Sequence, residues 1–252
     1  MNACIKGGSV GIVALALVAL FGCSESGTVN PTNTAPPPHV AHGPLNPDNP
    51  YDSVGIIHNE QCEFYMGYIA ETDTTIAQVW AHLSAAVQNL GTNEGWGQPY
   101  IDALLDSAKA QWNRLDASYD PIEELQSYNS GGAFTEREVQ YMNRIGFAFE
   151  VAQDSIVLMD SVSQIEADVN TESWNTDESA ARSVISIAKH SFCFWGGFFN
   201  WAYEWNIYTA CMDADAYSKG RRSGDSKKEA SDLSAIFSLL AAEGWEPGTE
   251  LP

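Results

Sequence analysis

Apolar residues recur every three or four positions along most of the chain, as they do on one face of an amphipathic α-helix. Residues 101–115 carry one such stripe, and residues 142–159 carry another. No stretch alternates apolar and polar residues for long enough to predict a strand, so the pattern predicts an all-α fold. The expected helices span roughly residues 53–71, 74–90, 99–118, 134–169, 177–217 and 226–243, with a short helical turn at 121–127.

Capping chemistry marks where several of these helices begin. A Ser, Thr or Asn followed three residues later by Glu or Gln is typical of a capping box, and this pattern occurs at residues 75–78, 135–138, 175–178 and 226–229. Asp120 precedes a proline, which is a second kind of helix start. We expect about six helices in a single bundle-like domain, with the two longest packed side by side.

The first 22 residues have a different pattern. A short apolar run at residues 11–21 follows Lys6 and leads directly to Cys23. Because the run is too short to cross a bilayer, it predicts a secretory signal peptide over residues 1–22. Leu20-Phe21-Gly22 before the cysteine resembles the bacterial lipobox, and this resemblance implies that the chain is cut before Cys23 and that Cys23 is acylated.

Residues 23–50 are expected to be the lipidated cysteine and a flexible tether. Seven of the 27 residues in 24–50 are proline, and Ser, Thr, Asn and Gly make up much of the remainder. Such a composition cannot bury a core and is typical of extended, mobile linkers. The expected organisation is therefore signal peptide, tether and an α-helical domain over residues 51–252.

Charge narrows the classes of partner. Removal of residues 1–22 leaves 11 basic residues against 33 acidic ones, a net charge of −22. Such a chain repels nucleic-acid phosphates and anionic lipid, so membrane contact is expected to come from the lipid on Cys23. The acidity indicates simple solubility or, alternatively, a surface resembling those of halophilic proteins.

Basic residues gather at one place in this acidic chain. They favour either a helix C-terminus followed by a loop or a local docking site for an acidic ligand or partner. The five residues lie within ten positions and are Lys219, Arg221, Arg222, Lys227 and Lys228.

Residues 192–208 contain nine aromatic side chains in 17 positions. One interpretation is a central helix that is apolar all round because other helices surround it. The alternative is an aromatic cleft that binds a small ligand, a glycan or an envelope protein. Its candidate binding residues are Trp195, Trp201, Trp205 and Tyr208.

Three cysteines remain in the domain after the signal peptide and Cys23 are set aside. Cys193 and Cys211 are 18 residues apart on one expected helix, roughly 27 Å, whereas a disulfide needs Cα atoms within about 7 Å. A disulfide would therefore include Cys62, and Cys193 is its preferred partner. His58 with Cys62 and His190 with Cys193 also share helical faces, so a Cys2His2 metal site and unlinked core residues are the alternatives.

No catalytic signature occurs in the sequence. There is no His-Glu-x-x-His zinc motif, phosphate-binding glycine loop, dinucleotide fingerprint or di-iron bundle motif. We therefore predict no catalytic residue, metal or cofactor, and we expect a non-enzymatic binding module. The alternatives are a hydrolase of an envelope or extracellular polymer, using His58 and His190 with nearby carboxylates, and a structural spacer or assembly subunit.

Two segments carry a resemblance to a known group. Asn49-Pro-Tyr-Asp-Ser-Val-Gly-Ile-Ile-His-Asn59 and Ser183-Val-Ile-Ser-Ile-Ala-Lys-His-Ser-Phe-Cys-Phe-Trp195 resemble segments of uncharacterised bacterial lipoproteins of the Bacteroidota type. The group has no assigned activity. The resemblance implies a lipid-anchored protein of the cell envelope, on the periplasmic or surface side of the outer membrane.

Overall fold

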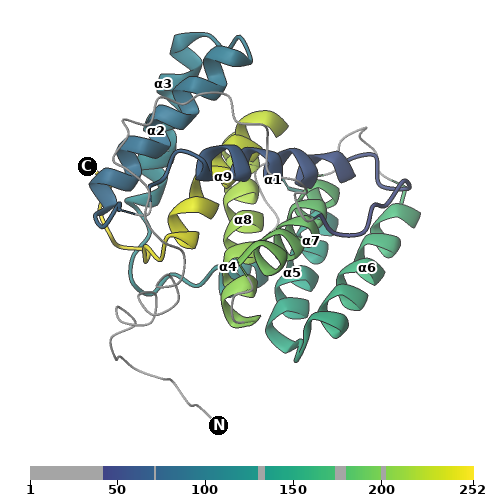
Figure 1. Ribbon diagram of the computed structural model, residues 1–252. Coiled ribbons are helices and arrows are strands. Elements are labelled where there is room, and N and C mark those ends of the chain that lie inside the picture. Colours follow the sequence, from purple (N-terminus) through teal and green to yellow (C-terminus); the bar gives the residue numbers. More distant parts are fainter. Residues whose placement is uncertain (1–41, 71, 130–133, 174–179, 200–202) are drawn as a thin grey trace. The chain divides into compact units, whose positions relative to one another are not determined.

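The chain folds into helices joined by short loops (Figure 1). The computed structural model describes residues 42–70, 72–129, 134–173, 180–199 and 203–252, except the side chains of residues 197–199 and 203–205. Over these residues the all-α prediction is confirmed, with nine helices and no strand. The helices are α1 (Asp52–Met66), α2 (Ile76–Asn93), α3 (Gln98–Trp112), α4 (Pro121–Ser127), α5 (Glu136–Val151), α6 (Ser155–Thr171), α7 (Ala180–Phe199), α8 (Tyr203–Ser223) and α9 (Lys227–Ala242).

The expected count of about six helices is wrong because both long segments are divided. Asp154 ends the first of them, since its side chain accepts hydrogen bonds of 2.9 Å from the amides of Ile156 and Val157 and so begins α6. Ile156 had been placed in a buried stripe, yet 75% of it is exposed. The second long segment becomes α7 and α8, and the expected turn at 121–127 is the helix α4.

The predicted helix starts agree with the structure wherever they are described. Thr75, Thr135 and Ser226 each form a complete capping box with the Gln or Glu three residues later. Asp120 accepts a hydrogen bond of 2.8 Å from the Ile122 amide. The predicted box at 175–178 lies outside the described residues. Local capping therefore placed these starts correctly from sequence.

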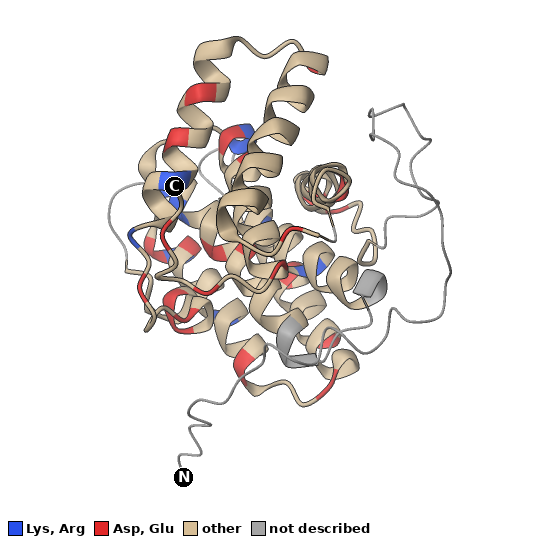
Figure 2. Ribbon diagram, turned by 60° about the vertical axis from the view of Figure 1, so that its left-hand side comes forward, with Lys and Arg blue, Asp and Glu red and all other residues tan. Residues whose placement is uncertain are grey.

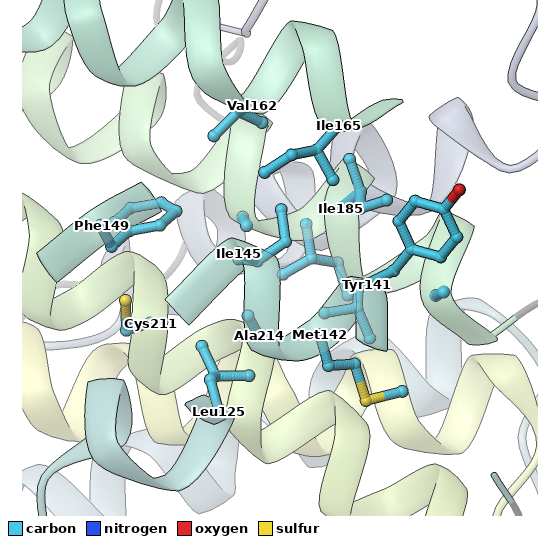
Figure 3. Close-up of a cluster of buried hydrophobic side chains, with 14 of the residues drawn as sticks. Leu125, Tyr141, Met142, Ile145, Phe149, Val162, Ile165, Ile185, Cys211 and Ala214 are labelled. Atoms are coloured by element: carbon cyan, nitrogen blue, oxygen red, sulfur yellow. The ribbon is translucent and has the colours of Figure 1, made fainter. Parts of the chain in front are cut away.

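Helices α7 and α8 contribute to two separate apolar clusters. Helix α8 packs against α7 and α9, and α1 lies across α7 and α9 (Figure 1). One cluster includes Leu125, Ile145, Phe149, Val162 and Ile185 and joins α4, α5, α6, α7 and α8 (Figure 3). The other includes Val79, Leu83, Trp112, Trp195 and Phe237 and joins α1, α2, α3 and α9 to α7 and α8. Because α7 and α8 are covered on two sides, they are buried around much of their circumference.

The end of the expected tether packs against the helices. Gly43 and Asn49 are buried. Asn49 Nδ2 donates hydrogen bonds to Glu166 Oε1 at 2.8 Å and to the Arg182 carbonyl at 3.3 Å, which attaches this segment to α6 and α7. The signal peptide, Cys23 and the tether up to residue 41 lie outside the described residues.

Acidic residues predominate over the described helices (Figure 2). Across these helices, none combines the length and the apolar character that a membrane crossing requires.

Gly55→Ala is expected to lower the free energy of unfolding by about 3 kcal/mol. A Cβ at Gly55 would lie 2.7 Å from the carbonyl carbon and 2.8 Å from Oγ of Ser186, so α1 and α7 would have to separate. Gly97→Ala is the matched control, because its Cβ would meet nothing closer than Pro99 Cδ at 3.7 Å, and we expect a loss below about 1 kcal/mol. Urea unfolding followed by circular dichroism measures the free energy of unfolding of both variants. Equal losses in the two variants would contradict the close approach of α1 to α7 at Gly55.

Candidate functional site

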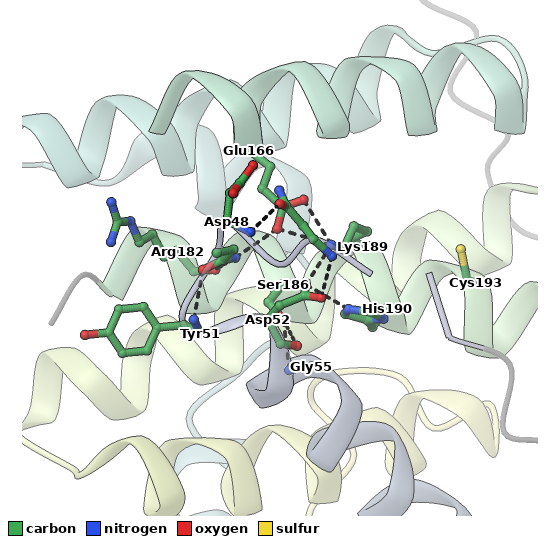
Figure 4. A network of polar contacts seen from close by, with 12 residues as sticks. Asp48, Tyr51, Asp52, Gly55, Glu166, Arg182, Ser186, Lys189, His190 and Cys193 are labelled. Carbon is green, nitrogen blue, oxygen red and sulfur yellow. Dashed lines mark hydrogen bonds and ion pairs between the residues drawn. The ribbon is translucent and has the colours of Figure 1, made fainter. Parts of the chain in front are cut away.

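A buried ammonium group joins α7 to α1 and α6 (Figure 4). Lys189 is only 1% exposed, and its Nζ lies 2.7 Å from Asp52 Oδ1 and 2.9 Å from Glu166 Oε2. His190 Nε2 lies 3.0 Å from the same Asp52 oxygen. A buried cation is tolerated when carboxylates compensate it, and here two carboxylates do so.

The start of α1 positions the Asp52 carboxylate. Ser186 Oγ donates a hydrogen bond of 2.8 Å to the Asp52 carbonyl and accepts one of 3.0 Å from the Gly55 amide, so α1 begins directly against α7. Burial raises the pKa of Asp52, but hydrogen bonds from His190 and Lys189 outweigh burial and lower that pKa to about 2. Asp52 is therefore a carboxylate at neutral pH.

A second buried centre surrounds Asp213 of α8. Ser191 Oγ donates a hydrogen bond to Asp213 Oδ2, Trp195 Nε1 lies 3.3 Å from that oxygen, and His58 Nε2 lies 3.8 Å from it. Burial raises the pKa of Asp213, although the charge of His58 and the hydrogen bonds of Ser191 and Trp195 act in the opposite direction. The pKa of Asp52 is thus lowered, whereas the pKa of Asp213 is raised.

Neither centre can reach a substrate. His58 and His190 are both 0% exposed. Ser191, which donates a hydrogen bond to the Asp213 carboxylate, is 0% exposed as well. Burial also raises the pKa of the Cys62 and Cys211 thiols well above the usual range. These polar groups hold helices together and leave no activated nucleophile within them.

The residues predicted to line an aromatic cleft do not form one where they are described. Trp195 is 0% exposed, and its Nε1 donates a hydrogen bond of 3.0 Å to Ser238 Oγ. Tyr208 is half-buried against the second apolar cluster. Trp201 lies outside the described residues, and so does the side chain of Trp205. The surrounded-helix interpretation therefore holds for Trp195.

Of the alternatives for Cys62 and Cys193, the disulfide is not formed, and Cys62, Cys193 and Cys211 are free thiols. Cys193 lies one turn beyond Lys189 and contacts Met159 of α6, with 3.9 Å between the sulfur atoms. Cys62 lies 3.8 Å from His58 Nε2 in the other cluster. The two thiols thus belong to different sides of α7. Over the described part of the chain, no group of three or more His, Cys, Asp and Glu side chains is arranged to hold a metal ion.

The described surface is hollowed between α3, α4 and α8 by an open cavity of about 780 Å³. Its lining includes Arg114, Tyr119, Glu123, Glu124, Lys219 and Arg222. Lys219 is neutralised there, because its Nζ lies 2.7 Å from Asp215 Oδ2 and 3.4 Å from Glu124 Oε2. Within the described residues Arg114 and Arg222 form no ion pair, and both are exposed.

The basic cluster predicted from sequence is dispersed over the fold. Lys219 and Arg222 line the cavity. Lys227 instead lies over the Tyr51 ring, 4.3 Å from its centroid, and Lys228 pairs with the buried Asp232 at 2.7 Å. These four residues therefore do not form a single docking surface.

Sequence reasoning missed Lys189 and Arg114. Lys189 is the one Lys or Arg between Arg182 and Lys219, and a lone cation in a long apolar segment signals a buried ion pair. No comparable signal marks Arg114, because it follows α3 and comes to line the same cavity as Arg222 through helix packing alone.

Comparison with protein-family models, with curated proteins and with solved structures finds no match to the chain.

Asp52→Asn is expected to lower the free energy of unfolding by about 3 kcal/mol at pH 7, because one carboxylate partner of buried Lys189 is lost. The folded pKa of Asp52 is about 2 against an ordinary 3.8, so this stabilisation is present above pH 3.8 and is lost as the pH falls through 2. Urea titrations should therefore show that the difference in free energy of unfolding between wild type and variant becomes smaller as the pH falls from 3.8 to 2.

Asp213→Asn is the matched control, because it changes a second buried aspartate, whose pKa is shifted upward. A raised folded pKa gives stability that is present below the ordinary value and is lost as the pH rises through the folded value. The loss in Asp213→Asn should therefore be smaller at pH 7 than at pH 4. A pH-independent loss in both variants would contradict the assigned shifts.

Proposed function

We propose that the chain is a lipid-anchored, non-enzymatic binding module of the cell envelope. Its ligand site is the cavity between α3, α4 and α8. The observation that carries the proposal is the position of Arg114 and Arg222, which line one cavity of about 780 Å³ and have no ion pair within the described residues. In a chain with 33 acidic and 12 basic residues, two guanidinium groups that line one cavity without a carboxylate partner in the described residues are a specific feature, although Arg222 also lies over the Tyr128 ring, 5.9 Å from its centroid.

Helix ends explain part of this arrangement. Arg114 follows the last turn of α3, and Arg222 lies in the last turn of α8. Cations are favoured at helix C-termini, so the dipole accounts for each arginine separately. It does not account for the convergence of both on one cavity, which supports a shared ligand.

The ligand class follows from the lining. A guanidinium group binds carboxylates and other oxyanions through two parallel hydrogen bonds. Glu123 adds an acceptor for hydroxyl donors, and Tyr119 contributes part of its ring to the wall. We therefore propose a small ligand that carries an oxyanion and hydroxyl groups, such as an acidic sugar.

The non-enzymatic character is supported by what the cavity contains. No histidine or cysteine belongs to its lining within the described residues. Burial and the neighbouring Asp215 raise the pKa of Tyr119 well above its usual range, so this phenol remains protonated. Lys219 is held by two carboxylates. These groups are suited to positioning a ligand more than to proton transfer.

The anchor is proposed from the lipobox resemblance at Cys23. More than one acyl chain on one cysteine holds a protein stably at a bilayer. With 18 residues between Cys23 and His42, the chain has room to present the cavity away from the lipid.

Cys23→Ser is expected to move the protein from the membrane fraction to the soluble fraction, because the acylated atom is lost. Cys4→Ser is the matched control, since Cys4 belongs to the segment expected to be removed, and it should leave membrane association intact. Fractionation with intact-mass measurement tests the pair. Persistent membrane association of Cys23→Ser without added lipid mass would contradict the anchor.

The double variant R114Q/R222Q is expected to weaken binding of an oxyanion ligand at least about tenfold, because two charge-assisted contacts are lost. Calorimetric titration with glucuronate, succinate and inorganic phosphate measures the affinity. Arg144→Gln is the matched control, since Arg144 pairs with Asp168 outside the cavity and should not affect binding. Equal affinity in the double variant would refute the cavity as the ligand site.

A further inference from the structure

We propose that the junction of α5 and α6 contacts the lipid bilayer directly. The α5–α6 tip, as we call it, consists of Phe147, Val151, Ile156 and Val157. This inference rests on the proposed lipid anchor at Cys23, and it adds a second membrane contact made by the folded domain itself.

The α5–α6 tip gathers most of the exposed large apolar side chains. Phe147 and Val151 near the end of α5 are 52% and 67% exposed. Ile156 and Val157 at the start of α6 are 75% and 47% exposed. Within the described residues the remaining large exposed apolar side chains are Leu45 and Ile57, which lie elsewhere in the sequence. Four such residues around one short connection form a patch, whereas singly scattered ones need no explanation.

Core packing does not account for these four residues. The opposite sides of α5 and α6 already supply Ile145, Phe149, Leu158 and Val162 to the first apolar cluster (Figure 3). The connection between the two helices lies at one end of the pair (Figure 1). The α5–α6 tip is therefore a second apolar surface, outside the core, on helices that are fully packed without it.

Patch size favours a bilayer over a second copy of the chain. Stable protein interfaces bury on the order of 800 Å² on each partner, whereas four partly exposed side chains provide a few hundred Å². A small surface is sufficient for a bilayer contact when an anchor keeps it close to the membrane. A fully extended chain from Cys23 to His42 reaches about 65 Å, so the proposed anchor permits that approach.

Charge specifies the kind of lipid. Glu150 and Asp154 are exposed beside the apolar residues, and residues 145–160 contain no Lys or Arg. Both carboxylates are already hydrogen-bonded, Glu150 by Gln126 and Asp154 by the first amides of α6. The α5–α6 tip is therefore suited to zwitterionic lipid and is repelled by anionic lipid. Added salt, which screens repulsion between charges, should strengthen contact with an anionic surface.

Hydrogen exchange on the lipidated full chain tests the proposal. On phosphatidylcholine vesicles, amides of residues 147–157 should exchange at least about threefold more slowly than in the anchor-free Cys23→Ser chain in solution. Vesicles containing phosphatidylglycerol should give less protection, and raising the salt concentration should restore it. Unchanged exchange on vesicles that carry the chain would overturn the proposal.

Variants separate apolar contact from simple proximity to the membrane. The double variant F147S/I156S keeps the anchor and should lose the protection at residues 147–157. Ile57→Ser is the matched control, because Ile57 is 47% exposed on α1, outside the α5–α6 tip, and it should keep the protection. Exchange that slows with protein concentration in the absence of vesicles, together with a dimer in gel filtration, would assign the patch to a second copy and overturn the proposal.

The proposed lipid anchor and the proposed bilayer contact of the α5–α6 tip can be refuted independently of each other. If the chain does not float with vesicles and carries no lipid mass, the proposed anchor is refuted. The Cys23→Ser chain then still tests the tip, because at millimolar phosphatidylcholine a fraction should float with the vesicles. That fraction should fall at least about fivefold in F147S/I156S, and an equal fraction would overturn the tip contact.

Discussion

One ammonium group, Nζ of Lys189, determines how the helices around it are arranged. A lysine that is 1% exposed is tolerated only with compensating carboxylates, and these come from the start of α1 and from the middle of α6. Asn49 donates to Glu166 in the same network, so the segment before α1 is held there as well. The direction of α7 relative to both neighbours follows from this one requirement, because the charge would otherwise be buried without a partner.

The same principle recurs on α8 and α9, where buried aspartates are matched with donors from other helices. The Asp213 carboxylate accepts a hydrogen bond from Ser191 and lies beside His58. The Asp215 carboxylate accepts hydrogen bonds from the hydroxyl groups of Tyr119 and Tyr128. The Asp232 carboxylate accepts hydrogen bonds from Tyr100 and Lys228. Buried polar groups that are hydrogen-bonded across helices in this way specify one arrangement of helices more than they add stability. Helix packing around them also buries His58, His190, Cys62 and Cys211, so these imidazoles and thiols are not accessible to an external ligand. The groups left for an external partner are therefore at the surface, in the cavity and at the α5–α6 tip.

Local signals in the sequence were reliable, and longer-range ones were not. The capping boxes at Thr75, Thr135 and Ser226 formed as predicted, because each depends on atoms within three residues of one another. The periodic stripe through residues 142–159 was misread as one helix, since Asp154 offers its carboxylate as a new N-cap in the middle of it. The sequence allowed two interpretations of Trp195 and favoured the surrounded helix, and the burial of this side chain agrees with that interpretation.

Periodicity, capping and composition account for the helical class, many helix starts and the acidic surface, because each arises from neighbouring residues or from a sum over the chain. Tertiary packing alone decided which side chains meet. Lys189 and Asp52 are 137 residues apart, and the sequence around neither residue predicts that the two will pair. The convergence of Arg114 and Arg222 on one cavity, the separation of Cys62 from Cys193 and the outward position of Ile156 have the same origin. Each depends on how helices cross and rotate against one another, which local interactions do not encode.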